Sequence, residues 1–305
     1  MRPLSPTLAE IARRDLNEIP ERIEQDLIIL REWIRQQRHL RARTSDEFLI
    51  AFLRRCKYSL EATKRRIDAF FSYYNVFPEV LRNRCVNSRI FDINRLGVHY
   101  YPEFPKCNNN AAILIARFGQ FDPKRYNVKE IFQFIMMAME MISLENDHAT
   151  VAGVCQIIDL KNISFERIKN FDRCLFQKYW WWVQECCPLR IKEVYVVNAD
   201  KDIQRKINFI KTFVKNQMQY PVFVIKTFED LYEYIPKCNL PEEYGGSNGH
   251  IAECIAYMED LLQSYRNYFN EDALYGCSEE LRAGEVVTYE AEFGLNGTFR
   301  KLSID

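Results

Sequence analysis

Carboxylate and histidine side chains are the first candidates for chemistry in this chain of 305 residues. Asp159 and Asp200 each follow an apolar run, and two such carboxylates could share general acid and base work. An aspartate at a strand-to-helix junction more commonly accepts hydrogen bonds from backbone N–H groups or caps the next helix. The 4 histidines are scattered, without the close pairing of a helical zinc site. We therefore predict neither an enzyme nor a metal site.

A glycine-rich stretch at residues 245–249 is the second candidate. No Lys-Ser or Lys-Thr pair follows it and no apolar strand precedes it, so neither phosphate-binding fingerprint is met. We interpret it as a turn that ends a domain. The sequence gives no support for nucleotide chemistry or for any cofactor.

Charge is balanced overall but unevenly distributed. The chain has 42 Lys and Arg against 42 Asp and Glu, so no global field directs it toward nucleic acid. Residues 31–66 hold 11 basic and 4 acidic residues, whereas residues 229–292 hold 3 basic and 15 acidic ones. A basic early segment suits an anionic surface, and a solvated helix face is the simpler alternative.

Several features predict a cytoplasmic protein that is only transiently at membranes. The 10 cysteines show no CxxC pair and no compact framework spacing, so we expect them to be reduced. The first residues are polar and lack the apolar core of a secretory signal. The longest apolar stretch, residues 131–142, is too short to span a bilayer, so any membrane contact is peripheral.

The early part of the chain is patterned as a small helical bundle. Apolar residues recur at helical spacing from Ile23 to Ile34, Thr44 and Glu47 could form a capping box, and Ser59 could cap a third helix. A polar connection at residues 82–94 follows.

From residue 111 onward, short apolar runs alternate with helical segments. The runs are apolar at consecutive positions, which is typical of strands buried on both faces. This alternation predicts an α/β fold with a largely parallel sheet. The expected strands are 112–118, 151–160, 193–198 and 222–228, the expected crossover helices are 128–144, 165–187 and 203–217, and a helix at 251–269 precedes an acidic, irregular tail.

Two of these helices are apolar on every side. One carries Tyr179 and three consecutive tryptophans at 180–182, and the other is rich in Phe and Met between residues 132 and 141. A helix that is apolar all round is ordinarily buried core. Met and aromatic residues also line adaptable apolar cavities, and composition alone does not choose between these readings.

The segment 203–214 differs, because it is amphipathic. Ile203, Ile207, Ile210 and Val214 form one apolar stripe, and basic residues that include Lys211 occupy the other sides. Such a helix can lie at a lipid interface. An ordinary crossover helix with a solvated outer face is the alternative.

Several segments, in order, resemble the CRAL-TRIO lipid-binding family, in its animal branch similar to α-tocopherol transfer protein and cellular retinaldehyde-binding protein. The stretch FLRRCKYSL at 52–60 is similar to the family's N-terminal helical module, and GTFRKL at 297–302 is similar to a tail of that branch. Between them, RFGQFDP, PLRIK, IKTF and LPEEYGG, at 117–123, 188–192, 210–213 and 240–246, with the run 153–160, are similar to the lipid-binding domain.

The resemblance implies three parts, namely a helical module (1–80), a lipid-binding domain (81–250), and a C-terminal helix with an acidic tail (251–305). The domain would enclose an apolar cavity between helices and a sheet. Strand alternation puts Val154, Gln156 and Ile158 on one face, where Gln156 could bind the ligand's polar head. The implied pocket residues are Phe132, Met136, Val154, Gln156, Ile158, Tyr179, Trp182 and Val194, and the implied gate helix carries Ile203, Ile207, Ile210 and Val214.

The implied function is to carry a non-covalently bound hydrophobic small molecule, such as a tocopherol, retinoid, carotenoid, fatty acid or phospholipid, and to release it at membranes. The alternative is a phosphoinositide-sensing module that is recruited to membranes. Arg190, Lys192 and Lys211 are the residues implied for contact with phosphoinositides or anionic membranes. Gln217 and Pro221 stand where such relatives carry basic residues, which predicts weaker contact.

Overall fold

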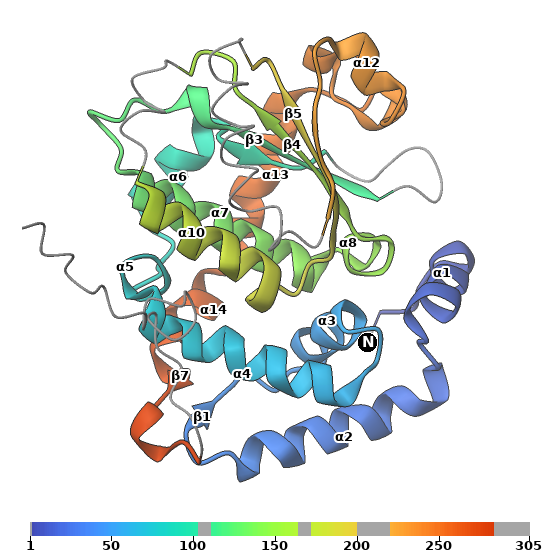
Figure 1. The fold of residues 1–305 in the computed structure, drawn as a ribbon, viewed down its shortest axis with the longest axis vertical. Coiled ribbons are helices and arrows are strands. Elements are labelled where there is room, and N and C mark those ends of the chain that lie inside the picture. The colour runs from blue at the N-terminus through green and yellow to red at the C-terminus, as the bar shows by residue number, and fades with distance from the viewer. Residues whose placement is uncertain (1, 103–110, 164–171, 200–219, 284–305) are drawn as a thin grey trace, which may run out of the picture.

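The computed structural model describes residues 2–102, 111–163, 172–199 and 220–283, and places the N-terminal helices on one side of an α/β domain (Figure 1). The N-terminal part consists of α1 (Pro6–Leu16), α2 (Pro20–Gln36), α3 (Asp46–Arg55), α4 (Leu60–Val76), α5 (Pro78–Leu81) and α6 (Ser88–Arg95).

Local sequence signals explain where most of these helices begin. Ser59 caps α4 by accepting a hydrogen bond from the backbone N–H of Ala62, as predicted. The expected capping box of Thr44 is wrong, because Ser45 is the N-cap of α3 and its side chain makes no capping bond. The polar stretch 82–94 is also more ordered than expected, since Asn87 caps α6 there.

In the described part of the chain, the main sheet has five strands in the order β2-β3-β4-β5-β6. They are β2 (His99–Tyr100), β3 (Ala112–Arg117), β4 (Val154–Asp159), β5 (Ile191–Val197) and β6 (Val222–Val224). Only β2 pairs antiparallel, with β3, and the other neighbours pair parallel. The predicted α/β class with a largely parallel sheet is confirmed. The strand expected at 151–160 begins later, because its first residues end α8 (Asp147–Ala152).

Two helices lie between the sheet and the N-terminal helices α3 and α4 (Figure 1). The first, α7 (Val128–Glu145), begins with a capping box formed by Asn127 and Glu130. The second, α10 (Arg173–Trp181), continues into a π-helical turn, Trp182–Cys186.

The other face of the sheet is covered by C-terminal elements. These are α12 (Phe228–Tyr232), α13 (Ile251–Ser264) and the 3-10 turns Lys237–Asn239 and Glu242–Tyr244. By contrast, α14 (Arg266–Asn270) packs into the α7 layer through Phe269. Further 3-10 turns lie at Phe118–Gln120, Asp272–Leu274 and Glu279–Leu281. The tail is not wholly irregular, because β7 (Gly276–Cys277) pairs antiparallel with β1 (Leu40–Arg41).

A buried ion network joins three parts of the chain. The fully buried Arg84 donates to Glu140 of α7 at 2.6 Å and to both carboxylate oxygens of Asp272 at 2.8 Å. Tyr74 of α4 also donates to Asp272, at 3.1 Å. The predicted boundaries at residues 80 and 250 therefore separate segments that share one set of buried charges.

Eight cysteines in the described residues are free thiols. Cys238 is disulfide-bonded, so the expectation that all cysteines are reduced is wrong at that position. Within the described ranges, no helix is both long enough and apolar enough to cross a membrane.

Candidate functional site

The central strand β4 presents different surfaces to the two sides of the sheet. Val154 and Ile158 pack in the apolar layer that contains α7, whereas Cys155 and Ile157 pack in the layer that contains α13. Gln156 lies between Val154 and Ile158 on the α7 side, because alternate residues of a strand share a face. Its register partners on the neighbouring strands are the apolar Leu114 and Val194. The α7 side of the sheet is thus apolar except for the amide of Gln156 and the buried imidazole of His99, whose register partner Ala116 lies on the same face.

Helices α7 and α10 supply the groups opposite this face. Phe132 of α7 and Tyr179 of α10 stack with ring centroids 4.5 Å apart and an interplanar angle of 7°. Met136, one helical turn beyond Phe132, is fully buried. The structure therefore brings most of the implied pocket residues into one apolar layer, comprising Phe132, Met136, Val154, Tyr179, Trp182 and Val194, with Ile158 packed against it.

Trp182 occupies a different position from Tyr179 in this layer. Its side chain is 0% exposed, and its ring centroid lies 6.4 Å from that of Phe70 in α4. Its indole Nε1 has no hydrogen-bond partner. Trp182 thus fills the contact between the π-helical turn and the N-terminal helices, whereas Tyr179 lies against α7.

The apolar face is incompletely covered. Ile158 is partly exposed, although β4 has a strand on each side. Phe118, Leu160 and Val222, which also border this layer, are partly exposed as well. Gln156 is 7% exposed, and no hydrogen bond joins its side chain to any residue within the described ranges. Apolar side chains and one amide therefore form an accessible surface at the carboxyl ends of the strands.

On the opposite side of the sheet, both carboxylate oxygens of Asp159 accept hydrogen bonds. Asp159 accepts hydrogen bonds from the Tyr244 hydroxyl at 2.6 Å, the Asn198 amide at 2.7 Å and the backbone N–H of Lys161 at 2.9 Å. Burial, followed by the neighbouring charge of Asp159, raises the pKa of Tyr244, which keeps its hydroxyl a donor. Asp159 therefore does the structural work expected of an aspartate at a strand end. Asp200 lies outside the described residues.

Arg190 and Lys192 lie beside the turn between α8 and β4. Arg190 donates to the carbonyl of Val151 at 2.6 Å, and burial lowers its pKa. A Cβ at Gly153 would lie 3.1 Å from the Cγ and Cδ atoms of Lys192, and the φ of +82° at this position favours glycine. Both basic side chains therefore reach the same corner of the sheet.

Asp15 of α1 is an acidic residue that interacts electrostatically with this pair. The pKa of Asp15 is lowered, first by the hydrogen bond from Arg14 and further by the charges of Arg190 and Lys192. Glu185 and Glu193 are the acidic residues that flank this pair in the sequence. Glu193 accepts from Tyr195 at 2.5 Å, and Glu185 lies 3.9 Å from Arg66.

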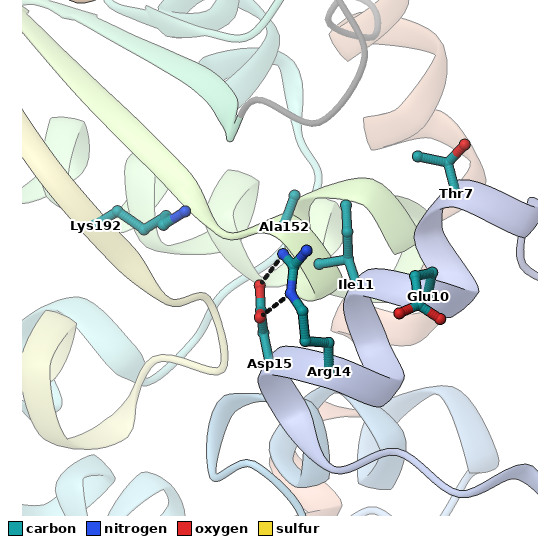
Figure 2. A pocket seen from close by; sticks show the side chains of 7 residues that line it. All are labelled: Thr7, Glu10, Ile11, Arg14, Asp15, Ala152 and Lys192. Carbon is teal, nitrogen blue, oxygen red and sulfur yellow. Dashed lines mark hydrogen bonds and ion pairs between the residues drawn. The ribbon is translucent and has the colours of Figure 1, made fainter.

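A cleft of about 440 Å³ separates α1 from this corner, and sequence reasoning missed it. Figure 2 shows Lys192 on one side of the cleft and Asp15 with Arg14 on the other. The sequence predicts only a polar start of the chain at residues 6–16, so both α1 and the place where it docks were missed. The lining residues are Thr7, Glu10, Ile11, Arg14, Asp15, Ala152 and Lys192.

Some predicted site residues fall outside the described residues. They are the gate positions Ile203, Ile207, Ile210 and Val214, the basic Lys211, and Gln217. Pro221 is described, and its carbonyl accepts a hydrogen bond from the backbone N–H of Val194 at 3.0 Å.

One group in the described part of the chain has side chains of metal-ligating types. The potential ligand atoms of His39, Asp68 and Cys277 lie within 4.8 Å of one another. Arg282 already donates to both oxygens of Asp68, at 2.6 and 2.8 Å, and lies 3.4 Å from the Cys277 sulfur. Burial raises the pKa of the Cys277 thiol to about 11. A guanidinium repels a metal cation and a protonated thiol is a poor ligand for one, so we assign no metal to this group.

Comparison with known proteins shows which families and proteins this chain is similar to. Residues 99–246 match the family described as CRAL/TRIO domain, and residues 19–91 match the one described as Pinta-like, UBA domain. The alpha-tocopherol transfer protein-like protein of Homo sapiens is 26% identical over 88% of this chain and 78% of its own length. Clavesin-1 of Rattus norvegicus is 25% identical over 80% of this chain and 69% of its own.

Among solved structures, the crystal structure of Sfh5 covers 83% of this chain and 92% of its own, at 16% identity and a TM-score of 0.47. The matched range 99–246 contains the sheet, the apolar face of β4 and the basic corner described above. Residues 99–246 therefore form a CRAL/TRIO domain, of a family which binds and transfers lipophilic ligands.

Proposed function

We propose that this protein is an intracellular carrier that encloses one hydrophobic small molecule and exchanges it at membranes. The observation that carries the proposal is the face of β4 toward α7, where the partly exposed Ile158 and the unpaired Gln156 lie among apolar side chains. A buried central strand has no structural need for an amide between Leu114 and Val194. A ligand with an apolar body and one polar group would satisfy both features.

The proposed mechanism needs no covalent chemistry. An apolar ligand gains about 25 cal/mol for each Å² that it removes from water, which offsets closure over it. At a membrane, the apolar stripe of the proposed gate, residues 203–214, contacts lipid instead, so opening becomes easier. Release is thereby coupled to arrival at a bilayer.

Native mass spectrometry of the purified protein tests the carrier directly. We expect a stoichiometric hydrophobic passenger that organic extraction removes and that identifies the ligand class. If the protein is repeatedly empty and takes up no tocopherol, retinoid, carotenoid, fatty acid or phospholipid, the carrier is wrong. The phosphoinositide-sensing module then becomes the better account.

The gate is tested by transfer rather than by affinity. Ile207→Asp places a carboxylate on the apolar stripe, so we expect slower ligand delivery to vesicles. Lys211→Gln, on a basic side of the same segment, is the matched control on neutral vesicles and should deliver at the wild-type rate there. Delivery by Ile207→Asp at the wild-type rate would make the segment an ordinary crossover helix.

Membrane contact is the third part of the proposal, with Arg190, Lys192 and Lys211 as the residues that meet anionic lipid from the cytoplasmic side. Support comes from the shared corner reached by Arg190 and Lys192. Each basic group near an anionic surface is worth about 1 kcal/mol, so Arg190→Ala with Lys192→Ala should weaken binding by about tenfold or more. Sedimentation with phosphoinositide-containing and neutral vesicles measures this, and equal binding by variant and wild type would remove the contact.

A further inference from the structure

Helix α1 is attached to the rest of the molecule by a small apolar contact of its own. Ile11, Ala12 and Leu16 pack with Val151 of α8, with Leu4 and Leu8 at the margin. This group is separate from the two larger apolar layers that hold the sheet and the other helices. A helix held by so little buried apolar area opens at a lower free energy than the core elements.

The place where α1 docks is the corner that carries Arg190 and Lys192. Asp15 faces Lys192 across the cleft, and the charges of both basic residues act on its carboxylate (Figure 2). Arg14 holds Asp15 in position with two hydrogen bonds, at 2.7 and 3.0 Å. Glu10 lines the same cleft but pairs with Arg13 through two hydrogen bonds, at 3.1 and 2.9 Å.

We propose that α1 is an autoinhibitory cover, in which Asp15 competes with anionic lipid for the Arg190 and Lys192 pair. This inference rests on the proposed membrane contact and adds its regulation. With α1 docked, a carboxylate of the chain itself offsets part of the field that would attract a phosphate headgroup. A sufficiently anionic bilayer displaces α1, so the protein reserves firm contact for membranes of high negative charge.

The decisive experiment is a double-mutant cycle on the full chain. Vesicles of phosphatidylcholine, with and without phosphatidylinositol bisphosphate, are sedimented with wild type, Asp15→Asn, the Arg190→Ala/Lys192→Ala variant, and the combination. At low salt we expect Asp15→Asn to bind the anionic vesicles about threefold more tightly, an effect that shrinks as salt screens the charges. In the Arg190→Ala/Lys192→Ala background the same substitution should have no effect.

Glu10→Gln is the matched control, because it removes the same charge from the same helix and cleft and frees Arg13, as Asp15→Asn frees Arg14. The charges that act on Glu10 are those of Arg13 and Arg14, whereas those of Arg190 and Lys192 act on Asp15. Glu10→Gln should therefore leave vesicle binding unchanged. The inference is overturned if Asp15→Asn has no effect, if Glu10→Gln has the same effect, or if the gain persists without Arg190 and Lys192, which would assign it to the freed Arg14. If Asp15→Asn leaves vesicle binding unchanged while loss of the basic pair still weakens it, the proposed membrane contact stands. Only the proposed role of α1 as a cover is then wrong.

Discussion

The two faces of the sheet are built from the same strands, yet the polar side chains of the central strand β4 differ between them. On the α13 side, Asp159 accepts three hydrogen bonds and the Tyr232 hydroxyl donates to the Tyr244 carbonyl at 2.9 Å, although the buried Tyr100 hydroxyl has no partner within the described residues. On the α7 side, Gln156 has no partner within the described ranges, and neither has the indole nitrogen of Trp182. Since an unpaired buried polar group costs free energy, Gln156 on the apolar face is the group that the proposed ligand would satisfy.

The largest expected effect concerns Trp182, which lies where the α7-side layer meets the N-terminal helices. Trp182→Ala should lower the free energy of unfolding by about 4 kcal/mol, because it leaves a cavity against Phe70. Urea denaturation measures the loss. A ring used only by the ligand would be truncated without loss of stability, so an unchanged unfolding midpoint would move Trp182 from the core to the pocket.

Asp159→Ala tests whether the α13 side is purely structural. The substitution leaves the Tyr244 hydroxyl and the Asn198 amide without their acceptor, so the free energy of unfolding should fall by about 3 kcal/mol. Ligand occupancy of the folded fraction, read by native mass spectrometry, should stay at the wild-type level. A selective loss of ligand would show that the two faces are coupled.

Two neighbouring isoleucines give a matched pair across the sheet. Ile157→Phe adds bulk to the closed face and should destabilise the protein by about 2 kcal/mol, since close-packed cores resist overfilling. Ile158→Phe adds the same bulk to the open face, so it should instead reduce ligand occupancy with little change in unfolding. Equal destabilisation by both would mean that the α7 side is as tightly packed as the other.

Gln156→Leu gives the smallest expected effect and the sharpest chemical information. The two side chains are similar in size, and an amide with no protein partner contributes little to the fold, so stability should be unchanged or slightly higher. If Gln156 binds the ligand's polar group, affinity should fall by about 1 kcal/mol, measured by fluorescence or displacement titration. Unchanged affinity would place the polar end of the ligand elsewhere.

The sequence predicted the sheet well because its strands are long apolar runs punctuated by turns. It predicted the faces of β4 for the same reason, since alternation fixes where Val154, Gln156 and Ile158 lie once the strand is placed. The resemblance also implies that Trp182 lines the ligand pocket. Periodicity could not show that Trp182 packs against Phe70, because contacts between distant helices depend on tertiary geometry.

The position of α1 could not be predicted for a related reason. The apolar stripe of α1 is short and would fit many grooves, and only the folded chain shows that it meets Val151 beside Arg190 and Lys192. The β1 and β7 pairing was missed because two-residue strands carry almost no pattern.

The buried charges around Arg84 have a consequence for how the chain is made. The N-terminal helices are synthesised first, yet Arg84 needs a carboxylate from α7 and another from Asp272, which lies 188 residues further on. Domains generally fold as units during synthesis, from the N-terminus onward. Here the first helices leave the ribosome long before their counter-charges exist, so their final packing waits for nearly the whole chain. Premature termination before Asp272 should therefore yield not a shortened carrier but a chain recognised by chaperones and proteases as unfolded.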